Sequence, residues 1–244
     1  MFFHIAIEVQ EDCRDKWFLS SIEFLLKRLV SGGSTYTLAF DEPRIKPVVC
    51  LKLATELLEL REDILYLDFD LQFSSILQNV GSSRYELIRS AGLLHVLQPS
   101  DEILDFLESL AEYKLQSGGV LVLDSLNSLQ NFLTGESIGE GSKEANQKTA
   151  LIVTVLQGIS RTFKKSLFIL NVTKQRPKQT IQDNPALWEK TLVGGRIIRF
   201  KSEEVISLKQ DPRRPRIISA TFEVPSERDR NDLPEKYEFE VSEI

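Results

Sequence analysis

The sequence has few of the residues that build metal centres or covalent cross-links. It contains two cysteines, Cys13 and Cys50, and two histidines, His4 and His95. Their spacing fits neither a disulfide framework nor a zinc site. No apolar run is long enough for a membrane span, and the first residues lack the features of a secretory signal. We therefore expect a soluble intracellular protein without a membrane anchor or a metal.

The balance of charge excludes a chain that is basic throughout. There are 30 basic and 36 acidic residues among 244, which gives a formal net charge of −6. Wholesale electrostatic attraction to nucleic acid or an anionic membrane is therefore not expected, although a local basic patch is compatible with this total. Hydrophobic residues make up 42% of the chain, enough for a substantial core in one domain.

Apolar patterning predicts alternating helices and strands. Helices are predicted over 16–31, 47–63, 74–92, 101–116 and 143–165. Strands are predicted over 34–40, 64–73, 93–98, 118–126, 166–173, 196–210 and 216–224. Composition predicts a mobile loop over 131–145, an irregular polar segment over 174–195, and a tail from 225 that pairs as one more edge strand.

This alternation predicts an α/β fold with a mainly parallel β-sheet flanked by helices and an antiparallel C-terminal extension. We expect one domain over 1–244, made of an N-terminal segment and helix (1–33), a core (34–224) and an acidic tail (225–244).

The segment after the first predicted strand has the context of a phosphate-binding loop without its chemistry. The loop DEPRIK leads into a helix, but Ile45 precedes Lys46 where a P-loop has Gly, and Pro47 follows where it has Ser or Thr. A branched residue resists the positive φ that Gly allows, and Pro offers neither an N–H to phosphate nor an oxygen to Mg²⁺. By itself the segment is equally typical of an ordinary strand–turn–helix connection.

A carboxylate lies at the end of the apolar strand GGVLVLD. Asp124 holds the position at which nucleotide-binding sheets place the acid that directs Mg²⁺. An aspartate that caps the following turn is the alternative.

Five segments together resemble the core of RecA-like recombinases, including archaeal RadA and the eukaryotic recombinase paralogues. Residues 32–54 resemble the Walker A region, 65–77 the strand and loop that follow it, and 120–129 the Walker B strand. Residues 167–177 resemble the strand that leads into the second DNA-binding loop, and 205–224 the C-terminal hairpin. They occur in family order, and the resemblance implies a RecA-like core.

The resemblance assigns the remnants of a nucleotide site. It matches Lys46 to the Walker A lysine and Asp124 to the Walker B aspartate, with the loop residues Glu42 and Arg44 beside them. Asp70 stands where the family has its catalytic Glu, one methylene shorter. Asn171 matches the family's Asn at the end of the fifth strand, and the Gln that should follow is Val172. These departures predict a site without hydrolysis and without a required cofactor. Weak binding of ATP and Mg²⁺ through Lys46 and Asp124 stays open.

Two basic segments are candidates for contact with single-stranded DNA. Where the family has its second DNA loop, this chain carries Lys174, Arg176 and Lys178, with Trp188 nearby. The predicted C-terminal hairpin carries Arg213, Arg214 and Arg216. A solvated loop with Trp188 packed on the core, and a solvated turn, are the alternatives. The segment matching the family's first DNA loop, 130–147, has more acid than base.

The N-terminus contains a two-residue pattern that this family uses for assembly. Phe3 and Ala6 form a Phe-x-x-Ala element, which in recombinases docks on a neighbour's sheet edge, and an N-terminal strand that covers the sheet is the alternative reading. Full recombinases carry a helical DNA-binding domain before the core; we expect none here, and this expectation favours an accessory paralogue.

The resemblance therefore implies a non-hydrolysing accessory paralogue of a RecA-type recombinase in homologous recombination repair. Its expected partners are a RecA-like subunit and single-stranded DNA, in the nucleus of a eukaryote or the cytoplasm of an archaeon. Two alternatives stay open: a weak DNA-dependent ATPase of the RecA class, and a RecA-fold subunit of an Elongator-like RNA-modifying assembly.

Overall fold

The computed structural model describes Leu26 and Val30 together with residues 32–79, 94–97, 103–112, 118–136, 141–177, 188–192, 195–223 and 236–241. Most of the predicted helix 16–31, as well as Phe3, Ala6 and Lys178, lies outside these residues. Within them, no helix is both long and apolar enough to cross a membrane.

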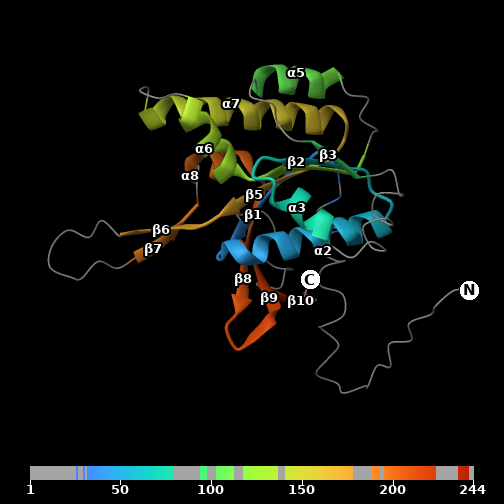
Figure 1. Cartoon of the computed structure of the whole chain (residues 1–244), viewed down its shortest axis with the longest axis vertical. Helices are drawn as coiled ribbons and strands as arrows, with labels where there is room; N and C mark the ends of the chain where they lie inside the picture. Colours follow the sequence, from blue (N-terminus) through green and yellow to red (C-terminus); the bar gives the residue numbers. More distant parts are fainter. Residues whose placement is uncertain are drawn as a thin grey trace, which may run out of the picture.

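An eight-stranded sheet forms the centre of the molecule, in the order β10-β9-β8-β1-β5-β4-β2-β3 (Figure 1). Its strands are β1 (Thr35–Phe40), β2 (Ile64–Asp68), β3 (Leu94–Leu97), β4 (Val120–Asp124), β5 (Ser166–Val172), β8 (Glu204–Asp211), β9 (Arg214–Glu223) and β10 (Lys236–Glu240). The strands from β8 to β3 are parallel, whereas β9 and β10 pair antiparallel. The predicted fold class is confirmed, and so is the edge strand in the tail.

Helices cover both faces of this sheet (Figure 1). One face carries α2 (Lys46–Glu59), which follows a short 3₁₀ helix η1 (Pro43–Ile45), and α3 (Gln72–Asn79). The other carries α5 (Ile103–Glu112), α6 (Leu126–Glu136), α7 (Gly141–Thr162) and α8 (Gly195–Lys201). Because both faces are covered, β1, β2 and β4 are buried along their whole length, which explains their continuous apolar sequences.

Two predictions for the second half of the chain are wrong. The predicted loop 131–145 is largely helical, since α6 runs to Glu136 and α7 begins at Gly141. Leu126, Leu129 and Leu133 recur at helical spacing and are fully buried, and this signal outweighs the Gly and Ser around them. The predicted strand 196–210 begins only at Glu204, because α8 uses the residues before it and buries Ile198.

The segment predicted to be irregular contains a β-ribbon instead. Strands β6 (Lys174–Pro177) and β7 (Trp188–Thr191) pair antiparallel as a separate two-stranded sheet. Figure 1 shows this ribbon extending outward from the body of the domain. Trp188 lies on β7 opposite Pro177 of β6. One of the two sequence-based alternatives had packed it on the core.

Strand β2 ends earlier than predicted, and this places the site. The predicted strand 64–73 stops at Asp68, and Leu71 then adopts a positive φ of 59°. The Asp70 carboxylate accepts a hydrogen bond from the Gln72 N–H at 3.1 Å, the local pattern by which Asp favours a turn. The turn starts α3 and leaves Asp70 at the edge of the sheet.

Candidate functional site

The candidate site lies where the parallel strands end. Strands β2 and β4 are neighbours in the sheet, and their last residues, Asp68 and Asp124, are partners in the register. Strand β1 on the far side of β5 leads through η1 into α2, which begins at Lys46. Parallel strands present their carboxyl ends at one edge, where α/β proteins bind ligands. Residues 46, 70 and 124, which are far apart in the chain, therefore meet.

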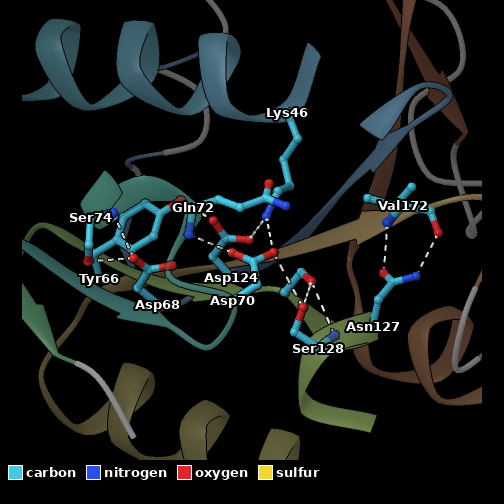
Figure 2. A network of polar contacts seen from close by, with 11 residues as sticks. Lys46, Tyr66, Asp68, Asp70, Gln72, Ser74, Asp124, Asn127, Ser128 and Val172 are labelled. Carbon is cyan, nitrogen blue, oxygen red and sulfur yellow. Dashed lines mark hydrogen bonds and ion pairs between the residues drawn. The ribbon is translucent and has the colours of Figure 1, made fainter. Parts of the chain in front are cut away.

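Lys46 is enclosed by two carboxylates. Its Nζ lies 2.5 Å from Asp124 Oδ1 and 2.6 Å from Asp70 Oδ2 (Figure 2). Only 2% of the Lys46 side chain and 1% of the Asp124 side chain are exposed, against 18% for Asp70. The structure thus brings together three of the residues that the sequence predicted. The ammonium of Lys46 is directed into the protein.

The second oxygen of Asp124 is also in use. Asp124 Oδ2 accepts a hydrogen bond from the Tyr66 hydroxyl at 2.5 Å. The Tyr66 ring stacks on Phe73 of α3 with centroids 3.9 Å apart, which fixes the hydroxyl in place. Burial raises the pKa of Tyr66 well above its usual value, so this hydroxyl stays protonated and donates. Asp124 therefore has one donor on each oxygen.

Charge and burial oppose each other at this ion pair. Burial raises the pKa of Asp124 to about 6, against the lowering effect of the Lys46 ammonium. Burial lowers the pKa of Lys46, but Asp124 and Asp70 more than offset this and leave it above its ordinary value. At pH 7 both groups are mainly charged, and each depends on the other to be so.

Asp70 joins the site to α6. In addition to Lys46, its Oδ2 accepts a hydrogen bond from the Ser128 hydroxyl at 3.3 Å, while Oδ1 accepts from the Gln72 N–H. Ser128 is in turn 2.9 Å from the Ser125 hydroxyl. Asp70 is thus held by donors from α2, α3 and α6.

The loop before Lys46 turns its backbone donors inward. The Ile45 N–H bonds to the Glu42 carbonyl at 3.2 Å, and the Lys46 N–H bonds to the Pro43 carbonyl. Pro43 and Pro47 have no N–H, and Ile45 keeps a helical φ of −84°. None of these four residues therefore directs a backbone N–H outward, as a phosphate cradle requires.

The other predicted site residues are a surface ion pair and a buried amide. Glu42 and Arg44 pair with each other at 2.6 Å on the surface. Asn171 is fully buried in β5, in register with Ala39 of β1.

The basic candidates lie on the two hairpins. Lys174 is exposed and Arg176 follows it on β6. Arg213 and Arg216 are exposed at the end of the β8–β9 hairpin. Arg214 is neutralised there by ion pairs with Asp211 at 2.8 Å and Glu238 at 2.9 Å. The Arg214 charge of this hairpin is thus neutralised by two carboxylates.

Sequence reasoning missed four residues that hold the site together. Tyr66, Asp68 and Ser128 contact or flank the ion pair. Asn127 clamps the end of β5, because its Nδ2 donates to the Val172 carbonyl at 2.9 Å and its Oδ1 accepts from the Val172 N–H at 2.8 Å. The apolar alternation around Tyr66 could have placed its side chain on the face of α2, but no local pattern identifies its partner.

The comparisons with known proteins agree with this architecture. Among solved structures, the crystal structure of the RadB recombinase resembles the chain with a TM-score of 0.56 and 17% sequence identity, over 87% of this chain and 93% of that one. No family model matches the sequence, and no curated protein does. At this identity the similarity concerns the fold alone. The chain has a RecA-like α/β fold.

The ion pair predicts a specific loss of stability. Replacement of Lys46 by methionine keeps much of the side-chain volume but leaves Asp124 and Asp70 without their cation. We expect Lys46→Met to lower the free energy of unfolding by about 3–5 kcal/mol, as measured by chemical denaturation.

Lys52→Met is the matched control, because Lys52 forms only a partly exposed pair with Glu56 at 3.3 Å. Its expected cost is below about 1 kcal/mol. The double variant Lys46→Met/Asp124→Asn should recover part of the loss. Equal costs for Lys46→Met and Lys52→Met would contradict a structural role for the buried pair.

Proposed function

We propose that the chain is a non-hydrolysing accessory paralogue of a RecA-type recombinase, which acts in recombinational DNA repair by binding a protein partner and single-stranded DNA. The RecA-like fold and the order of the five resembling segments support the family assignment. The observation that carries the proposal is the engagement of Lys46 by Asp124 and Asp70.

That engagement removes what a phosphate needs. A P-loop lysine reaches the β- and γ-phosphates, and backbone N–H groups around it bind the same oxygens. Here the ammonium is neutralised by two carboxylates, and the Ile45 and Lys46 N–H groups are used within the loop. A triphosphate would have to compete with both carboxylates and would meet their negative charge.

Hydrolysis meets a further obstacle at Asp70. In RecA-like recombinases the residue at this position activates the attacking water. Here the Asp70 Oδ2 already binds the Lys46 ammonium and accepts a hydrogen bond from the Ser128 hydroxyl. A general base must be free to accept a proton and correctly placed to within a fraction of an ångström. Asp70 is instead a neutralising partner of Lys46.

The proposal predicts little or no nucleotide binding. Calorimetric titration with Mg-ATP should give no saturable heat below about 1 mM, and single-stranded DNA should induce no phosphate release. The weak-ATPase alternative predicts the opposite, with turnover that Lys46→Ala abolishes. Submicromolar binding of ATP would overturn the proposal.

The β6–β7 ribbon is the proposed DNA-binding arm. It extends from the carboxyl end of β5, beside the remnant site, and Lys174 at its base is exposed (Figure 1). The sequence adds Arg176 on β6 and Lys190 on β7, with Trp188 on the same strand. Cations that track a phosphate backbone next to an aromatic residue are typical of single-strand binding.

Charge reversal in this ribbon should weaken DNA binding. For Lys174→Glu/Arg176→Glu we expect at least tenfold weaker binding of single-stranded DNA at low salt. The dependence of log K on log salt should also become shallower by about 1–2, because fewer counterions are released. Fluorescence anisotropy measures both quantities.

Lys52→Glu/Arg61→Glu is the matched control, since it changes the same charge on and just after α2, outside the ribbon. Its affinity should stay within about twofold of the wild type. Equal weakening by both pairs would indicate a non-specific charge effect. Preference for transfer RNA over single-stranded DNA would favour the Elongator-like alternative.

The proposed protein partner is a RecA-like subunit. Affinity purification of the tagged chain from its source cell, followed by mass spectrometry, should recover a recombinase or a second paralogue in near-stoichiometric amount. Nuclease treatment before elution separates direct association from bridging by DNA. Recovery without any RecA-like protein would contradict the assigned role.

A further inference from the structure

Three carboxylates converge at the end of the sheet, and among the described residues one lysine contacts them. Asp68, Asp70 and Asp124 each offer a carboxylate oxygen, and these oxygens lie within 4.8 Å of one another. Lys46 binds Asp70 and Asp124. The formal charge of the four groups is −2 when all are ionised. The three carboxylates therefore carry more negative charge than the one ammonium neutralises.

Asp68 supplies a second, independent observation. It is fully buried, and its Oδ2 accepts two hydrogen bonds from Ser74, from the N–H at 2.7 Å and from the hydroxyl at 2.6 Å. Its Oδ1 is buried with no hydrogen-bond donor from the described part of the chain. Figure 2 shows this oxygen on the side of Asp70 and Asp124, away from Ser74. A buried carboxylate oxygen without a partner is costly and uncommon.

We propose that Asp68, Asp70 and Asp124 bind a divalent metal ion without nucleotide, in exchange with the Lys46 ammonium. Oxygen-only carboxylate ligands suit hard cations such as Mg²⁺ and Mn²⁺. The Lys46 ammonium contacts two of the three ligands, so it and the metal exclude each other. The lysine stem is flexible enough to withdraw when a metal enters. The proposal departs from the sequence-based expectation of a chain without a metal.

The proposal differs from metal binding at a P-loop and does not rest on the proposed function. A P-loop holds Mg²⁺ through a Ser or Thr hydroxyl and the phosphates of the nucleotide, and here Pro47 occupies the hydroxyl position. Asp68, which the sequence analysis did not assign to a nucleotide site, becomes a metal ligand in this proposal. Binding of metal is therefore testable with no ATP present.

Electron paramagnetic resonance of free Mn²⁺ measures this binding directly. We expect weak binding of one Mn²⁺ by the nucleotide-free wild type, and at least tenfold tighter binding by Lys46→Met, because the competing ammonium is gone. In the Lys46→Met background, Asp68→Asn should abolish the gain. Asp105→Asn, on the exposed side of α5, is the matched control and should leave it unchanged.

A second measurement covers the case in which Lys46→Met does not fold. Excess MnCl₂ should then raise the melting temperature of the wild type and of Asp105→Asn, but not that of Asp68→Asn. An identical Mn²⁺ response of the wild type and Asp68→Asn would overturn the proposal, as would the absence of Mn²⁺ binding by a folded Lys46→Met. Neither result bears on the tests of DNA binding and partner capture. The proposed metal site and the proposed function can therefore be refuted independently.

Discussion

The buried ion pair of Lys46 with Asp124 constrains everything at the carboxyl edge of the sheet. Each charge would be strongly unfavourable in this environment without the other, so the first turn of α2 and the end of β4 have to be placed together. Tyr66 supplies the remaining donor to Asp124 from β2, and Phe73 of α3 holds its ring. Five elements around the ion pair, counting α6 through Ser128, thus share one network of hydrogen bonds.

In this arrangement Lys46 and Asp124 serve the cohesion of the fold. A lysine and an aspartate at these strand ends suit Mg-ATP when their charges point at a ligand. In this chain Asp124 accepts a hydrogen bond on each oxygen, and the loop of Pro43 and Ile45 closes on its own carbonyls. The same geometry therefore gives Lys46 a structural role and leaves the loop without a need for glycine. A lysine bonded to one buried and one partly exposed carboxylate stabilises the fold, whereas glycines matter only where a backbone wraps a phosphate.

Some of this could be predicted from the sequence and some could not. The central strands were visible because burial on both faces makes them continuous apolar runs, and the end of one run located Asp124. Asp70 was assigned only through the resemblance to RecA-like recombinases, because the predicted strand ran past it. The hydrogen bond from Tyr66 to Asp124 spans 58 residues and leaves no local pattern. Helix α6 was not predicted because Gly and Ser lie near its end. The β6–β7 ribbon was not predicted because its sequence is polar and its strands have no apolar face. Patterns of hydrophobicity report burial, and they say little about which polar groups meet.

The site and the ribbon are connected through two adjacent residues of α6. Ser128 donates to Asp70, while Asn127 holds both backbone groups of Val172, the last residue before the turn into β6. The Asn127 amide bonds to the backbone N–H and carbonyl of Val172 as a neighbouring strand would. These two hydrogen bonds fix the direction in which the chain leaves β5. The side chain at position 172 takes no part in this contact. The root of the ribbon is therefore fixed through the backbone of residue 172, and this contact places no demand on the side chain there.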